Sequence, residues 1–211
     1  MAYAVKEIYY TLQGEGAQTG RAAVFLRFSG CNLWSGREED RTIAICNFCD
    51  TDFLGTEGPG GGKFDTAAEL ASAVKARWPD ELPGDPLVVC TGGEPLLQLD
   101  AELVDQLHAR GFAVAVETNG TLPLPLGVDW VCVSPKAGTH LVVTSGDELK
   151  LVHPQPGIDP ASFLALDFQH FFLQPLDGPN QALHQRSVAE YCLAHPQWRV
   201  CLQRHKILGL P

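Results

Sequence analysis

Short apolar runs recur along most of the chain, separated by polar segments and by turns rich in glycine and proline. Residues 22–28 are apolar almost throughout, which is typical of a strand covered on both faces. Residues 4–10 alternate more loosely and predict a shorter strand before a glycine-rich turn. The same pattern predicts further strands at 87–90, 112–117, 129–134, 148–153, 168–174 and 198–203.

Helical patterns are fewer than strand patterns. Thr66 and Glu69 have the spacing of a capping box, which predicts a helix start. Pro95 suits the first turn of another helix, and Gly111 is a typical residue to end it. The glycines of residues 55–62 predict a flexible loop. The predicted helices span about 66–77, 96–110 and 180–194, with a short one near 161–166.

This order of elements predicts an α/β fold with a parallel sheet. A closed eight-unit barrel usually needs about 250 residues, whereas this chain has 211. We therefore expect a single domain over residues 1–211, folded as a partial, open TIM-like barrel of about six parallel strands with a reduced set of helices. Ligands bind at the carboxyl edge of such sheets. Polar residues cluster there, namely Thr91, Glu117, Asn119, Ser134, Lys136, Gln174 and Asp177.

Charge and composition narrow the class of partner. The formal net charge is −10, and no basic stripe interrupts it, which argues against binding to nucleic acid. No apolar run approaches twenty residues, so we expect no membrane span. The N-terminal residues lack the pattern of a signal peptide, and we expect a cytoplasmic protein. Its seven cysteines then indicate reduced thiols rather than disulfides.

Three of these cysteines lie in one segment, residues 31–51, which we call the cysteine loop. Fourteen residues separate Cys31 from Cys46, two separate Cys46 from Cys49, and residues 35–41 look like an exposed charged insertion. Structural zinc sites typically use two C-x-x-C pairs, whereas this loop contains one. Three thiolates instead favour a [4Fe–4S] cluster with one iron free to chelate S-adenosylmethionine. A non-enzymatic iron–sulfur or zinc module remains the alternative.

The remaining cysteines, Cys90, Cys132, Cys192 and Cys201, are expected to be small buried hydrophobic residues. The turn at residues 91–95, Thr-Gly-Gly-Glu-Pro, follows an apolar strand. Together with the cysteine loop, it resembles the radical S-adenosylmethionine superfamily, in which this turn meets the methionyl amino group. The common superfamily motif has three residues between the first two cysteines, so the loop here is a lengthened variant.

Further segments resemble the 7-carboxy-7-deazaguanine synthase family, and together they cover essentially the whole chain. These segments are residues 10–16, 27–33, 49–51, 117–120, 134–136 and 174–177. The resemblance implies a radical lyase that converts 6-carboxy-5,6,7,8-tetrahydropterin to 7-carboxy-7-deazaguanine with loss of ammonia, in queuosine and 7-deazapurine biosynthesis. It also implies Mg²⁺, an external electron donor and a homodimer. Another radical S-adenosylmethionine reaction, such as activation of a glycyl-radical enzyme, is the enzymatic alternative.

The same resemblance assigns roles to individual residues. Cys31, Cys46 and Cys49 would ligate the [4Fe–4S] cluster, and Thr51 would bind Mg²⁺. The expected S-adenosylmethionine contacts are Phe48, Asp50, Gly93, Glu117, Ser134, Lys136, Gln174 and Asp177. The expected substrate contacts are Leu12, Gln13, Gly14, Arg27, Thr91 and Pro211.

Each of four assignments has a simpler structural alternative. Arg27 could form a structural salt bridge, because it lies in an otherwise apolar strand. Lys136 could be a surface charge, and Thr51 could merely begin a strand or turn. Pro211 could belong to a frayed terminus, since chain ends are usually poorly ordered.

Overall fold

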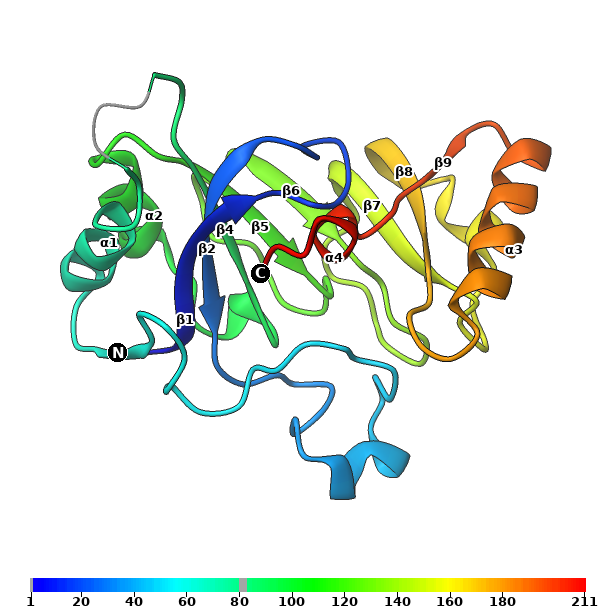
Figure 1. Cartoon of the computed structure of the whole chain (residues 1–211), viewed down its shortest axis with the longest axis horizontal. Helices are drawn as coiled ribbons and strands as arrows, with labels where there is room; N and C mark the ends of the chain where they lie inside the picture. Colours follow the sequence, from blue (N-terminus) through cyan, green and yellow to red (C-terminus); the bar gives the residue numbers. More distant parts are fainter. Residues whose placement is uncertain (1, 80–82) are drawn as a thin grey trace.

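The computed structural model describes residues 2–79 and 83–211, and within them the strands form one sheet of nine (Figure 1). Their order across the sheet is β3-β1-β2-β4-β5-β6-β7-β8-β9. The strands are β1 (Tyr3–Leu12), β2 (Ala22–Phe28), β3 (Gly62–Phe64), β4 (Leu87–Gly92), β5 (Ala113–Thr118), β6 (Trp130–Val133), β7 (Ser145–His153), β8 (Asp167–Pro175) and β9 (Trp198–Val200).

Neighbouring strands run parallel from β2 to β9, which confirms the predicted α/β class. The described residues contain seven such strands, close to the expected six. β1 instead pairs antiparallel with β2, because residues 13–21 are too few for a parallel crossover. β3 was not predicted. It begins at Gly62, the last residue of the stretch 55–62 predicted as a flexible loop, and forms by backbone pairing with β1.

The helices confirm the prediction in part. The helix α1 (Ala67–Lys75) begins at the capping box of Thr66 and Glu69. The single helix predicted over 96–110 is wrong, because Asp100 accepts a hydrogen bond from the Leu103 amide and caps a separate helix. That region holds the 3₁₀ turn η2 (Pro95–Leu97) and then α2 (Ala101–His108).

Towards the C-terminus, α3 (Gln181–Ala194) matches its prediction, while the short helix near 161–166 is a 3₁₀ turn, η3 (Pro160–Phe163). β9 ends before the predicted boundary of 203, and the unpredicted helix α4 (Arg204–Leu208) follows it. The insertion in the cysteine loop forms the exposed 3₁₀ turn η1 (Glu38–Ile43).

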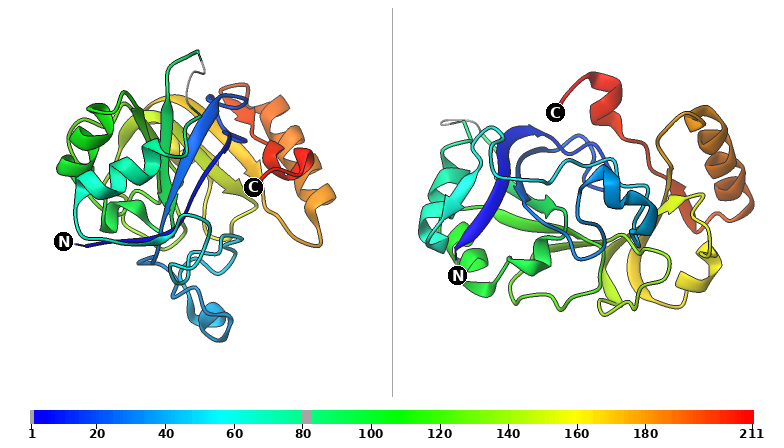
Figure 2. Two further views of the ribbon diagram at one scale, coloured as in Figure 1. Left: turned by 60° about the vertical axis from the view of Figure 1, so that its left-hand side comes forward. Right: turned by 90° about the horizontal axis from the view of Figure 1, so that it is seen from below.

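The sheet has one face packed against helices. α1 and α2 lie on one side of the sheet, and α4 lies on the other (Figure 2). Leu70 of α1 and Leu107 of α2 are fully buried in the main core together with alternate strand residues such as Val24 and Val88. α3 adds Val188 to this core.

The opposite face of the sheet carries far less apolar surface. Its separate cluster of buried residues consists of Ala23, Leu87, Val89 and Ala115. Because side chains alternate between faces, Arg27, Thr91 and Glu117 continue this second face as β2, β4 and β5 approach their carboxyl ends. The alternation therefore gathers polar side chains at one edge of the sheet.

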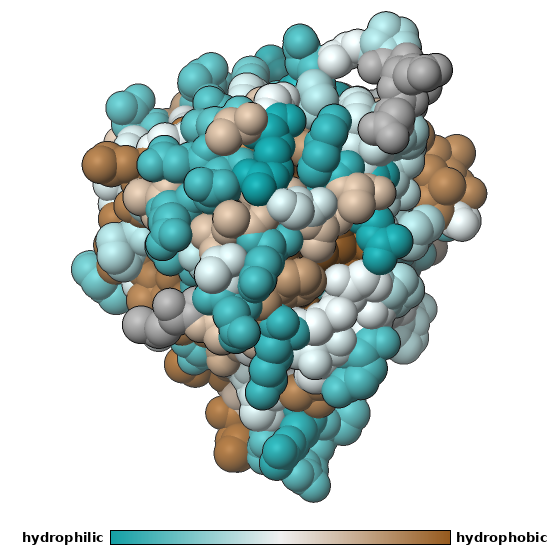
Figure 3. Space-filling view, turned by 90° about the vertical axis from the view of Figure 1, so that its left-hand side faces the viewer, coloured by the Kyte–Doolittle hydropathy of each residue, from teal (hydrophilic) through white to brown (hydrophobic). Residues whose placement is uncertain are grey.

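The outer surface is largely hydrophilic on the side that Figure 3 shows. Hydrophobic side chains stand among hydrophilic ones on the lobe at its lower end, to which η1 belongs. Ile43 and Ile45 in this part of the chain are exposed. In the described part of the chain, no helix is long and apolar enough to cross a membrane.

We expect Leu107→Ala to lower the free energy of unfolding by about 2 to 5 kcal/mol, because it empties a fully buried site between α2 and the sheet. The matched control is Leu193→Ala in α3, where the side chain is 85% exposed and the change should stay within about 0.5 kcal/mol. Urea titrations of both variants measure this difference. Equal losses would show that the described packing of α2 is wrong.

Candidate active site

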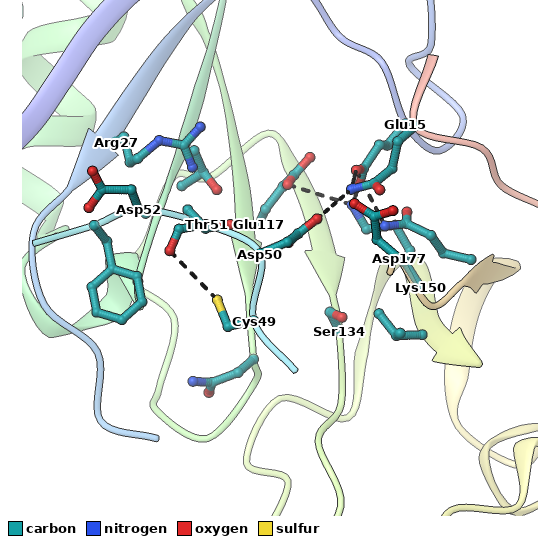
Figure 4. Close-up of a pocket in the computed structure, with 18 of the residues that line it drawn as sticks. Glu15, Arg27, Cys49, Asp50, Thr51, Asp52, Glu117, Ser134, Lys150 and Asp177 are labelled. Atoms are coloured by element: carbon teal, nitrogen blue, oxygen red, sulfur yellow. Dashed lines mark hydrogen bonds and ion pairs between the residues drawn. The ribbon is translucent and has the colours of Figure 1, made fainter. Parts of the chain in front are cut away.

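A cavity of about 390 Å³ opens at the carboxyl edge of the parallel strands. Figure 4 shows residues from several strand ends and from the cysteine loop pointing into it. Of the residues predicted as cluster, Mg²⁺, S-adenosylmethionine or substrate contacts, all but Gly14 line this cavity. Gly14 lies behind it, where a Cβ would stand 2.3 Å from Nδ1 of His205. The sequence thus predicted a set of residues that the fold brings together.

The cysteine loop and the glycine turn leave the sheet side by side. β2 and β4 are parallel neighbours, with Phe28 opposite Gly92. A Cβ on Gly92 would come 2.3 Å from the Phe28 carbonyl oxygen, and one on Gly93 would come 2.1 Å from that of Gly30. Glycine is therefore required here for packing against the start of the cysteine loop. This requirement holds whether or not a ligand also contacts the turn.

A buried carboxylate ties three loops together beneath the cysteines. Glu94 is fully buried and accepts hydrogen bonds from Thr118 Oγ1 at 2.7 Å and the Asn119 amide at 2.8 Å. Burial raises the pKa of Glu94. Asn119 Nδ2 in turn donates to Asn32 Oδ1 at 2.9 Å, next to Cys31. Glu94 and Asn32 thus position the loop of the first cysteine. Sequence reasoning singled out neither, although a carboxylate among apolar and glycine residues is a usable signal.

The three thiols of the cysteine loop line the same wall of the cavity. A hydrogen bond from the Cys46 thiol lowers the pKa of Cys49 to about 6 and raises that of Cys46. Burial raises the pKa of Cys31. Across residues 2–79 and 83–211, no three His, Cys, Asp or Glu side chains surround a point suited to a single metal ion. A four-iron cluster is larger than one ion, and three thiols around one cavity fit its ligand chemistry.

Thr51, expected to bind Mg²⁺, is half-buried at the cavity, and its carbonyl oxygen accepts a weak hydrogen bond from Cys49 Sγ at 4.0 Å. The neighbouring Asp52 pairs with Lys6 at 2.8 Å. Figure 4 shows Cys49, Asp50 and Thr51 following one another along the same segment of the cavity wall.

Lys136 and Ser134 act as a pair at the end of β6. The Lys136 ammonium donates to the carbonyl oxygen of Ser134 at 2.6 Å and to its hydroxyl at 2.8 Å. Lys136 is half-buried at the cavity, so it is not the exposed surface charge of the alternative, and this burial lowers its pKa.

Lys150 forms the centre of a buried ionic cluster at the floor of the cavity (Figure 4). Its ammonium pairs with Glu15 and, at 3.6 Å, with Glu117. Burial alone would lower the pKa of Lys150, but the two carboxylates raise it well above its ordinary value. Gln13 Nε2 also donates to Glu117 at 2.9 Å. The predicted Glu117 is therefore already engaged by two groups of this chain.

Sequence reasoning missed Lys150 and Glu15. A usable signal was present for Lys150, because it stands between Leu149 and Leu151 in an apolar strand. The same pattern singled out Arg27. Glu15 is hidden in a glycine turn, where its partner in β7 cannot be read from local sequence.

Arg27 forms the structural salt bridge that the sequence left open. Its Nε lies 2.7 Å from Glu7 Oε1, and its guanidinium also donates to the Tyr9 hydroxyl at 2.8 Å. Burial lowers the pKa of Arg27, but its partners Tyr9 and Glu7 raise this pKa by more, so that it lies above its ordinary value. Arg27 also lines the cavity, so the salt bridge and a ligand contact are compatible.

The C-terminal segment, residues 203–211, lies against the cavity, and we call it the C-terminal strap. Thr11 Oγ1 donates to the Pro211 carbonyl group at 3.4 Å, so Pro211 lies at the cavity as expected and not in a frayed end. Lys206 pairs with Asp50 and Asp177, and Gln203 contacts Glu15. None of these strap contacts was predicted, because no helix was expected at residues 204–208 and the partners lie far away in the sequence.

Comparisons with known proteins agree with this geometry. No protein-family model matches the chain. The chain is 63% identical over 211 residues to the 7-carboxy-7-deazaguanine synthases of Caulobacter vibrioides and Bordetella pertussis, and each comparison covers 100% of both chains. It is 57% identical over its full length to that of Burkholderia multivorans.

The fold also matches a solved structure. The crystal structure of QueE from Escherichia coli superposes with a TM-score of 0.71 at 26% identity, covering 96% of this chain and 94% of that chain. The two comparisons at 63% identity cover the whole length of this chain. This chain therefore belongs to the 7-carboxy-7-deazaguanine synthase family.

Proposed function

We propose that this protein is a radical lyase that converts 6-carboxy-5,6,7,8-tetrahydropterin to 7-carboxy-7-deazaguanine with loss of ammonia, in queuosine biosynthesis. The observation that carries the proposal is the presence of three thiols, a glycine turn and a buried ionic cluster around one cavity. Family membership supplies the reaction. The strap contributes to the lining of this cavity, whose volume of about 390 Å³ suits a small free substrate.

The proposed resident groups are a [4Fe–4S] cluster, S-adenosylmethionine and Mg²⁺. Cys31, Cys46 and Cys49 would hold the cluster, which together with S-adenosylmethionine supplies radical chemistry. Thr51 would offer Mg²⁺ its hydroxyl oxygen, since this ion commonly keeps waters and substrate oxygens as its other ligands. The proposed S-adenosylmethionine contacts are Phe48, Asp50, Gly93, Glu117, Ser134, Lys136, Gln174 and Asp177.

The substrate side of the cavity offers both charge and hydrogen-bonding groups. The guanidinium of Arg27 can pair with the pterin carboxylate while it stays bonded to Glu7, because it has five donors. Gln13 and Thr91 are buried polar residues that can match ring donors and acceptors. Leu12 and Pro211 would complete the pocket, and Gly14 would support it from behind. Together these residues would orient the substrate and exclude water.

Several broader features belong to the same proposal. We infer that the whole chain is one domain, since one sheet runs through the described residues, and that this sheet curves as a partial barrel. We further propose a cytoplasmic homodimer that takes electrons from an external donor and binds neither nucleic acid nor a membrane. The net charge of −10 supports the proposal that the protein does not bind nucleic acid.

Anaerobically reconstituted protein should release 7-carboxy-7-deazaguanine when it receives reductant, S-adenosylmethionine, Mg²⁺ and the carboxytetrahydropterin. Chromatography with mass detection measures the product. Cys46→Ala should abolish both product and iron-based absorption, because it removes a cluster ligand. Cys192→Ala, which removes a thiol from α3 outside the cavity lining, is the matched control and should keep both.

An intact cluster without product would contradict the reaction proposed here. S-adenosylmethionine consumed in proportion to product would favour a different radical reaction. Equal loss of iron in Cys46→Ala and Cys192→Ala would contradict the assignment of the cluster ligands.

Arg27→Gln should raise KM for the pterin roughly 10- to 100-fold, because a charge-assisted hydrogen bond contributes about 1.5 to 3 kcal/mol. Glu7→Gln tests the structural alternative, since it breaks the same ion pair but leaves the guanidinium free for substrate. Steady-state kinetics should show KM for Glu7→Gln near the wild-type value. If both variants raise KM equally, Arg27 serves the salt bridge and not the substrate.

A further inference from the structure

The C-terminal strap contacts both sides of the cavity. On one side, Lys206 Nζ lies 2.6 Å from Asp50 Oδ2 and 2.5 Å from Asp177 Oδ2. On the other side, the Arg204 amide donates to the Gly14 carbonyl oxygen at 3.1 Å. The strap therefore joins the cysteine loop and the end of β8 to the turn that follows β1.

The strap is held mainly by these polar contacts. α4 has no buried residue, and Ile207 and Leu208 are 71% and 62% exposed. A helix of five residues has little stability of its own. Partly exposed ion pairs are individually weak, so removing Lys206 should free the strap without unfolding the sheet.

Lys206 also brings two carboxylates together. Asp50 and Asp177 contact the same ammonium, although two neighbouring carboxylates repel one another. Each ionised carboxylate still has free acceptor positions for hydroxyl or amino groups of a ligand. Lys206 thus preorganises an acceptor pair made of Asp50, directly after Cys49, and Asp177, just after the end of β8.

We propose that Lys206 is a positioning residue that couples the cofactor and substrate subsites of the cavity. The inference rests on the proposed function, in which Asp50 and Asp177 contact S-adenosylmethionine and Pro211 contacts the pterin. S-adenosylmethionine bonded to the free acceptor positions of both carboxylates would fix them in place beside Lys206, and the strap would then keep Pro211 in place for the pterin. By linkage, each ligand raises the affinity of the other by the same factor.

The coupling is measured with the reconstituted protein and 6-carboxypterin, a stable probe that carries the substrate's carboxylate. Anaerobic calorimetry gives its dissociation constant with and without S-adenosylmethionine. In the wild type, S-adenosylmethionine should tighten 6-carboxypterin binding at least about fivefold. In Lys206→Met, which keeps the length of the side chain but removes its charge, this factor should fall close to one.

Two further variants and a second readout separate coupling from general damage. Lys206→Arg restores the charge and should recover part of the coupling, while Lys63→Met removes an exposed lysine of β3 outside the cavity lining and should keep all of it. Hydrogen exchange of residues 203–211 should be faster in Lys206→Met, with the sheet unchanged.

The outcomes distinguish this inference from the function on which it rests. If the wild type binds both ligands, and Lys206→Met shows the same coupling factor and the same hydrogen exchange as the wild type, the role of Lys206 alone would be overturned. A wild-type protein that binds neither ligand would overturn both the coupling and the proposed function.

Discussion

The parallel register of β2 with β4 is the constraint on which the rest of the site depends. It sets Phe28 opposite Gly92, so the cysteine loop and the glycine turn must leave the sheet within contact distance. Side chains on either glycine would collide with the backbone of the loop. The next strand adds the bonds of Glu94 to Thr118 and Asn119. The position of the thiols thus follows from backbone packing before any cluster binds.

The second consequence of the parallel sheet is a polar face that is nevertheless buried. Its cations, Arg27, Lys136 and Lys150, each lie against oxygen acceptors of this chain. Such groups would be costly to bury alone, because an unpaired charge loses its hydration. Their pairing keeps these cations at one cavity of an acidic chain, among a similar number of carboxylates.

Local sequence patterns predicted the features that neighbouring residues determine. Apolar runs gave the parallel strands, Thr66 and Glu69 gave the start of α1, and motif resemblance gave residues that the fold brings to one cavity.

What depends on distant partners could not be read from the sequence. Glu15 needs Lys150 from β7, and Lys206 needs Asp50 from the cysteine loop. The break between η2 and α2 has a different cause. Asp100 is a typical N-cap residue that the sequence shows, but the apolar pattern over 96–110 favoured one continuous helix.

We propose that three thiolates of the cysteine loop hold a four-iron cluster with one iron left for S-adenosylmethionine. The most direct test is low-temperature electron paramagnetic resonance of the reduced, reconstituted protein. Adding S-adenosylmethionine labelled on its amino nitrogen should shift the cluster signal and introduce hyperfine coupling from the label. A spectrum that is identical with and without S-adenosylmethionine, or a protein that binds zinc and shows no iron signal, would contradict this assignment of the three thiolates.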